Sequence, residues 1–109
     1  MTGAVTIDAT QLPADPLAAA AAFHSEIVPM VRDVQAGDVL VSFALAEHTH
    51  DAWRRAAVQA LARDLSPRRV NGLVGDDAAG LAQLADYLAK APGVTGQVFE
   101  VAANGAKTG

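Results

Sequence analysis

Apolar residues along this 109-residue chain follow two patterns that alternate with each other. Short runs rich in β-branched and aromatic residues predict strands at positions 5–7, 39–43, 70–74 and 97–101. Between these runs, apolar residues recur every three or four positions, which predicts helices over 17–34, over 51–66 and between 76 and 92. The run Val39–Phe43 is almost continuously apolar, as expected for a strand buried on both faces of a parallel sheet.

Polar residues and prolines mark the ends of these helices. Asp15 is placed to cap the first helix, with Pro16 in its first turn. Asp51 is expected to cap the second helix, which Ser66-Pro67 ends. Pro29 lies inside the first helix, where it should remove one backbone hydrogen bond and bend the helix. For the third helix, the expected cap is Asp76 or Asp77 and the expected stop is Pro92-Gly93.

The alternation of strands and helices gives the order β-α-β-α-β-α-β. This order predicts an α/β fold in which about four parallel strands form one sheet, joined by right-handed crossovers, with three flanking helices on its two faces. We expect a single domain over residues 1–103 and a loose tail over 104–109.

Composition narrows the range of functions. Apolar residues make up 51% of the chain and charged residues 18%, which is typical of a folded domain. Eight Lys and Arg against twelve Asp and Glu give a net charge of −4, which offers no basic patch for nucleic acid. The chain has no cysteine for a disulfide, a thiolate nucleophile or a zinc site. Because it shows neither a secretory signal nor an apolar run of membrane-spanning length, we expect a soluble cytoplasmic protein.

Several segments follow one another in a recognisable order: Ala56-Ala57-Val58, Ala62 to Pro67, Arg69-Val70-Asn71 and Val94 to Val98. The first two resemble parts of the helix pattern YxxSKAAVxxLTRxLA of the short-chain dehydrogenase/reductase family. The third resembles its strand pattern RVNAVxPG, and the fourth its TGQxxxVDGG. Upstream, Ile27 to Met30 resembles the family's LPxM segment, and Gly37 to Ala44 resembles GRIVNISS. The resemblance implies that the sheet is a truncated Rossmann-like one.

The same resemblance places the family's catalytic positions on residues of different chemistry. The catalytic serine falls on Ala44, the tyrosine on Asp51, the lysine on Arg55, and a helical asparagine near Pro16. In the family the tyrosine donates a proton because the lysine lowers its pKa, whereas an aspartate is ionised at neutral pH and cannot replace a phenol as the acid. The only tyrosine, Tyr87, lies on another predicted helix. We therefore expect no catalytic residue.

No cofactor is expected either. A glycine-rich turn that opens a helix brings backbone amides to a pyrophosphate, and neither GxGxxG nor GxxxGxG occurs in the chain. We expect no room ahead of Val5 for the family's cofactor-binding units. After Val74 only Gly75 remains of the family's Pro-Gly pair and of the substrate-covering segment that follows it.

Two histidines could ligate a metal. His48 and His50 lie two residues apart beside Glu47 and Asp51, and His24 is the only other histidine. Because no stronger ligand spacing supports a metal, a polar loop before a helix is the preferred interpretation.

Three further polar segments have structural interpretations. Gly75-Asp76-Asp77 follows a strand and opens a helix, so its amides could bind an anion, but two aspartates favour a simple helix cap. Arg68-Arg69 is expected to be solvated. Arg54-Arg55 is expected to be an exposed helix face with a role at an interface.

The elements that resemble the family are those through which the family assembles. Helices resembling 17–34 and 51–66 form a four-helix contact with a second subunit there. A sheet of about four strands also leaves an unprotected edge and a small core, which favours assembly. The expected interface residues are Phe23, Ile27, Met30, Trp53, Ala57, Ala60 and Leu61.

The leading functional hypothesis is a non-catalytic subunit that pairs with a full-length, catalytically complete short-chain dehydrogenase/reductase and stabilises or shapes it. Self-association is the other form of assembly. The alternative is a stand-alone, homo-oligomeric small-molecule binding module with its ligand at the carboxyl ends of the strands, near residues 44–50 and Gly75. A third hypothesis is an enzyme that uses His48, His50 or Asp51 in a new way.

Overall fold

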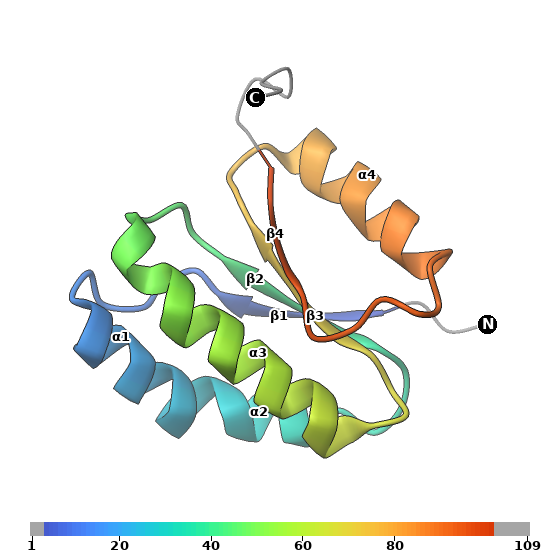
Figure 1. Cartoon of the computed structure of the whole chain (residues 1–109), viewed down its shortest axis with the longest axis horizontal. Helices are drawn as coiled ribbons and strands as arrows, with labels where there is room; N and C mark the ends of the chain where they lie inside the picture. Colours follow the sequence, from blue (N-terminus) through green and yellow to red (C-terminus); the bar gives the residue numbers. More distant parts are fainter. Residues whose placement is uncertain (1–3, 102–109) are drawn as a thin grey trace.

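The computed structural model describes residues 4–101, which form one sheet of four parallel strands with helices on both faces (Figure 1). The strands lie side by side in chain order: β1 (Val5–Ala9), β2 (Val39–Phe43), β3 (Val70–Val74) and β4 (Val98–Glu100). In register, Val39 pairs with Val5 on one side and with Val70 on the other. The predicted α/β class, with a parallel, Rossmann-like sheet, is confirmed.

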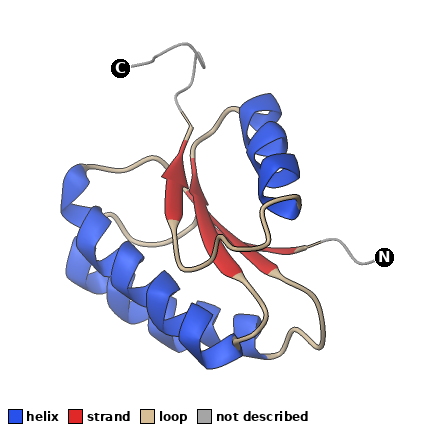
Figure 2. Cartoon of the chain, turned by 45° about the vertical axis from the view of Figure 1, so that its right-hand side comes forward, coloured by secondary structure: helices blue, strands red, loops and turns tan. Residues whose placement is uncertain are grey.

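Helices cover the two faces of the sheet unequally (Figure 2). On one face, α1 (Pro16–Ala22), the π-helical segment η1 (Phe23–Ile27) and α2 (Val28–Arg32) follow one another and lie beside α3 (Asp51–Leu65). The other face carries α4 (Ala78–Ala89). No helix within residues 4–101 is long and apolar enough to cross a membrane. The tail predicted at 104–109 lies outside the described residues.

The three crossovers do not all have the same hand. Since the strands follow chain order, each crossover moves one strand further in the same direction, and its hand depends only on which face its helix covers. The first two crossovers place their helices on one face, whereas α4 lies on the opposite face (Figure 1). The prediction that all the crossovers are right-handed is therefore wrong, because the α4 crossover has the opposite hand to the other two.

Burial on both faces of the central strands explains where α4 goes. On the face toward α1 and α3, alternate residues of β2 pack with the aromatic side chains of Phe23 and Trp53. On the other face, Leu40 and Leu73 are also buried, and they contact Leu88 of α4. The apolar stripe predicted for α4 packs here, and it comprises Leu81, Leu84, Ala85 and Leu88. Without α4, the leucines of β2 and β3 would face water.

The first helix begins as predicted and accommodates its internal proline. The Asp15 carboxylate accepts a hydrogen bond from the Ala18 N–H at 2.9 Å, and Pro16 occupies the first turn. Directly before Pro29, the helix widens into η1, in which the Val28 N–H bonds to the Phe23 carbonyl. Because a proline ring crowds the carbonyl four residues back, the wider turn gives the ring space.

The start of α3 differs from the prediction. A 3₁₀ turn (η2, His48–His50) precedes the helix, so His50 occupies the cap position and makes no side-chain cap hydrogen bond. Asp51 lies in the first turn instead of capping it. For α4, the cap residue is Asp77, one of the two predicted residues, although its side chain makes no cap hydrogen bond.

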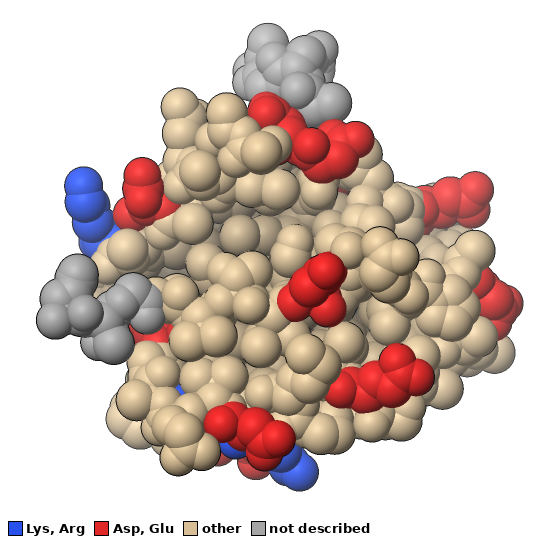
Figure 3. Space-filling view, turned by 180° about the vertical axis from the view of Figure 1, so that it is seen from behind, with Lys and Arg blue, Asp and Glu red and all other residues tan. Residues whose placement is uncertain are grey.

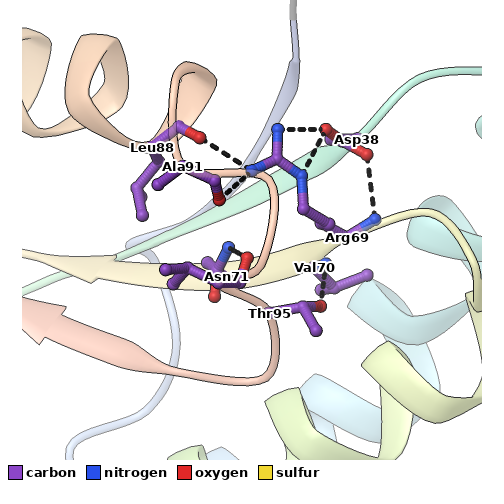
Figure 4. Close-up of polar contacts among 8 residues, drawn as sticks. Asp38, Arg69, Val70, Asn71, Leu88, Ala91 and Thr95 are labelled. Carbon is purple, nitrogen blue, oxygen red and sulfur yellow. Dashed lines mark hydrogen bonds and ion pairs between the residues drawn. The ribbon is translucent and has the colours of Figure 1, made fainter.

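Arg69 ties together three elements at the amino ends of the strands (Figure 4). Its guanidinium forms an ion pair with Asp38 at 2.7 Å, and it also donates to the carbonyl of Leu88, at 2.8 Å, and to that of Ala91. Arg68 donates to the Val34 carbonyl at 3.0 Å. The expectation that Arg68-Arg69 is solvated is therefore wrong, because both side chains satisfy carbonyl groups that end helices.

Two of the segments that resemble the family's patterns hold each other in place. The Asn71 amide donates to the Val94 carbonyl at 3.0 Å, and its oxygen accepts from the Gln97 N–H at 3.1 Å. The Thr95 hydroxyl accepts from the Val70 N–H at 3.0 Å (Figure 4). These bonds fix the connection between α4 and β4 against β3. In this chain, Asn71 and Thr95 of the two segments thus have a structural role.

The Asp38–Arg69 contact predicts how stability depends on pH. Burial by itself raises the pKa of the Asp38 carboxyl, but hydrogen bonds and charge from Arg69 outweigh it, so the pKa lies below its usual value of 3.8. A lowered folded-state pKa stabilises the fold above the unfolded-state value, and this contribution is lost as pH falls through the folded-state pKa. We expect urea unfolding to show a free energy that decreases below about pH 4.

Asp38→Asn is the matched variant for this prediction, because it keeps the shape of the side chain and removes its titration. Its stability should decrease less steeply with falling pH than that of the wild type. Equal slopes for the two proteins would contradict the assignment to Asp38. Hydrogen bonds from Thr10 and Arg32 also lower the pKa values of Asp8 and Asp64, respectively. These two carboxyl groups contribute equally to the slopes of both proteins.

Candidate functional site

A cleft of about 630 Å³ opens at the carboxyl ends of β1 and β2. Its walls come from the segments that follow these two strands, together with Ala19 of α1 and two residues at the start of α3, His50 and Arg54. The binding-module hypothesis expected a ligand near residues 44–50 and Gly75. Residues 44–47 and His50 do line the cleft, but Gly75 does not, since it packs against Val101 beside β4.

His50 closes one end of the cleft. Its Nδ1 accepts a hydrogen bond from the Trp53 indole N–H at 3.0 Å, and its Nε2 lies 3.0 Å from the Ala14 carbonyl oxygen. Because an indole nitrogen can only donate, Nε2 carries the ring proton and donates it to that carbonyl. His50 thereby holds the segment after β1 against α3.

These contacts argue against His50 as a metal ligand, since both ring nitrogens already have protein partners. His48 is exposed, and the Nδ1 atom of His24 lies 2.8 Å from the Ala20 carbonyl oxygen. Within residues 4–101, no three His, Asp or Glu side chains are grouped so that they could hold a metal ion.

Arg54 is the least expected residue of the site. The residue is only 7% exposed, and the guanidinium carbon lies 4.7 Å from the centre of the Phe43 ring. The indole of Trp53 is also close, at 5.9 Å. The prediction that Arg54 and Arg55 form an exposed face is therefore wrong for Arg54 and correct for Arg55.

The sequence contained a signal for this burial. Arg54 precedes the buried residues Ala57, Val58 and Leu61 at helical spacing, so it continues the inner stripe of α3 toward the amino end. An arginine at such a position suggests an exposed residue, yet its aliphatic stem and planar guanidinium can pack on an aromatic ring.

The charge of Arg54 has no paired carboxylate in the described part of the chain. The ion pairs there are Arg32–Asp64 and Arg69–Asp38, and the Arg54 Nε has no hydrogen-bond partner. Burial lowers the pKa of the Arg54 guanidinium, while the charges of Asp51 and Glu100 act in the opposite direction. An arginine nevertheless remains protonated at neutral pH, so the cleft contains a fixed positive charge.

The three positions aligned with the family's catalytic residues lie around Arg54. Ala44 lines the cleft, whereas Asp51 and Arg55 line a smaller adjoining pocket of about 170 Å³. Arg54 borders both spaces. Tyr87 is exposed on α4, which packs on the opposite face of the sheet.

Four of the seven expected interface residues belong to the chain's own core. Phe23, Ile27, Ala57 and Leu61 are buried among the residues that pack against the sheet, so they offer a partner no surface. The expectation that these four residues lie at an interface is therefore wrong, because their apolar spacing reflects packing within the chain. Met30 and Ala60 are exposed, and Trp53 is partly buried.

Acidic residues outnumber basic ones in the chain, which gives the net charge of −4. Seen from behind, Asp and Glu side chains are spread over the molecule, and Lys and Arg are visible only near its margin (Figure 3).

Comparison with known proteins agrees with this fold. A family model described as a short chain dehydrogenase-like protein (SDR-like) matches residues 7–101 of the chain. No curated protein and no solved structure gives a significant match. The matched range includes all of β2, β3 and β4, every described helix, and all the residues that line the cleft. The chain therefore belongs to the short-chain dehydrogenase-like family.

Proposed function

We propose that this chain is a non-catalytic subunit that pairs with a catalytically complete short-chain dehydrogenase/reductase and stabilises or shapes it. The observation that carries the proposal is the side-chain chemistry at the positions aligned with serine, tyrosine and lysine. Ala44 has no hydroxyl group, Asp51 has no phenol, and Arg55 carries a guanidinium in place of the lysine amine. A carbonyl reduction by the family's mechanism needs a positioned acid that can release a proton at neutral pH, and this set supplies none.

The outer face of α1, α2 and α3 supports pairing. Leu17 is 83% exposed and Met30 is 46% exposed, which is unusual for large apolar side chains. Small exposed residues, Ala56 and Ala60, lie on the adjacent helix α3. A surface of small and apolar residues on two neighbouring helices can pack closely against an equivalent pair of helices across a two-fold axis. We therefore assign this face to the partner.

Assembly and activity can be measured together. The chain, mixed with a catalytically complete relative from the same organism, should form a hetero-oligomer in size exclusion coupled to light scattering. Alone, it should give no NADPH-dependent ketone reduction, and neither should the triple variant Ala44→Ser, Asp51→Tyr, Arg55→Lys, because a hydride donor must first be bound and oriented. Turnover by the chain alone would refute the proposal, and so would a stable monomer that binds no such relative.

The second candidate function is a stand-alone, homo-oligomeric small-molecule binding module. The specific observation in its favour is the 630 Å³ cleft, which has the size of a small-molecule site and lies at the carboxyl ends of parallel strands. Light scattering separates the two candidates, because this one requires an assembly built from the single chain.

A further inference from the structure

Arg54 is a buried arginine whose charge has no ion-pair partner among the described residues. The residue as a whole is more than nine-tenths buried and its Nε has no hydrogen-bond partner, while Asp51 and Glu100 act on its charge without forming an ion pair with it. Leaving a charged donor unsatisfied is costly, and proteins seldom retain such a group without a partner. The Phe43 ring beneath it compensates only in part, since a cation–π contact does not use the N–H donors.

The cleft beside Arg54 is large enough for a small organic molecule, and much of its wall is apolar. Ala9, Leu12, Pro13, Ala19 and Ala44 contribute hydrocarbon surface to it. The polar groups of His50 are already used by Trp53 and Ala14. Asp15 likewise has its carboxylate engaged at the start of α1. Arg54 is thus the one buried cation among the lining residues, and it borders a space whose walls are partly apolar.

We propose that this cleft binds a monocarboxylate with a hydrocarbon body, and that Arg54 is its anchoring cation. A planar guanidinium matches a carboxylate, and the apolar walls take the hydrocarbon part. A phosphate ester fits less well, because a dianion would keep one uncompensated charge beside Asp15 and Glu47, in a protein of net charge −4. The site also lacks a glycine-rich turn, which would supply backbone donors to a phosphate.

This inference does not depend on the proposed pairing with a partner subunit. The cleft lies at the carboxyl ends of the strands and is formed by one chain, whereas the face assigned to the partner comprises exposed residues of α1, α2 and α3. Ligand binding and assembly are measured separately, so either can fail without the other.

The single tryptophan provides a direct readout, because the indole of Trp53 bonds to His50 and lies beside Arg54. The full 109-residue chain is titrated with 4-phenylbutyrate, and fluorescence is followed. The neutral analogue 4-phenylbutan-1-ol and inorganic phosphate serve as comparison probes. We expect the carboxylate to bind about tenfold or more tightly than the alcohol, and phosphate to bind more weakly than the carboxylate.

Two cleft variants and one control complete the test. Arg54→Gln should weaken binding of 4-phenylbutyrate about tenfold or more, while Arg63→Gln, the same change at an exposed position of α3, should leave it unaltered. Circular dichroism checks that each variant folds. If Arg54→Gln does not fold, Ala44→Leu decides, since it fills the cleft, keeps Arg54 and should also weaken binding.

Several results would overturn the proposal. They are the absence of carboxylate binding at millimolar concentration, equal affinity for the alcohol or for phosphate, and a folded Arg54→Gln variant that binds as tightly as the wild type. Unaltered binding in a folded Ala44→Leu variant would place the ligand outside the cleft and would have the same consequence.

Discussion

Replacing Arg69 with methionine is expected to lower the free energy of unfolding by about 2–4 kcal/mol, a large part of the stability of a small domain. Methionine keeps most of the apolar stem and removes the guanidinium. Asp38 would then lose its ion-pair partner, and the carbonyls of Leu88 and Ala91 would lose their donor. Because one side chain joins β2, β3 and the end of α4, the loss is larger than that of a single contact.

Urea unfolding followed by circular dichroism measures this effect. The chain offers a matched control in Arg32→Met, which breaks the ion pair between Arg32 and Asp64. The side chains of that pair are 61% and 40% exposed, whereas the Arg69 side chain is 17% exposed. An exposed ion pair contributes little because solvent screens it, so the control should change the free energy of unfolding much less than Arg69→Met does. Equal losses in the two variants would show that the Arg69 contacts have no special weight.

The second large effect is expected for Ala57→Glu, which should unfold the chain or cost several kcal/mol. Ala57 is 3% exposed and lies on the side of α3 that faces the sheet, within the main core. A glutamate there is both too large for its site and a charge without a partner. Ala60→Glu introduces the same side chain three residues further along the same helix, at an exposed position, and should leave the fold intact.

The pair of variants also separates folding from assembly. Thermal unfolding reports the fold, and light scattering reports the assembly formed with a partner. Ala60→Glu should lower the mass of that assembly without lowering the melting temperature of the isolated chain. If Ala60→Glu leaves assembly unchanged, the contact face proposed on α3 is wrong. If Ala57→Glu is as stable as the wild type, the assignment of Ala57 to the core is wrong.

Local pattern was sufficient for the order and type of the strands and α-helices, although it did not predict the π-helical segment η1 or the 3₁₀ turn η2. Each strand is a short run of apolar and β-branched residues, and such a run needs only its neighbours in sequence to be recognised. The same holds for Asp15-Pro16 at the start of α1, since a cap bonds to an N–H group three residues away. The stripe of Leu81, Leu84 and Leu88 predicted the buried side of α4, because helical spacing brings those residues to one face.

Local pattern failed for polar side chains, such as Arg69 and His50, that bond to a distant part of the chain. Arg69 contacts Asp38, 31 positions earlier, and the carbonyl of Ala91, 22 positions later. His50 bonds to the carbonyl of Ala14, 36 positions earlier. These residues look solvated in the sequence, because nothing near them in the chain shows that a partner will be present.

The sequence by itself thus determined the order and type of the elements, the parallel α/β class, and the altered chemistry at Ala44, Asp51 and Arg55. Only the tertiary structure decided that α4 crosses to the other face, that four expected interface residues form the core, and that Arg54 lies on Phe43 beside a cleft. The physical reason is that periodicity fixes which side of an element is apolar, whereas the packing of several elements decides what that side meets.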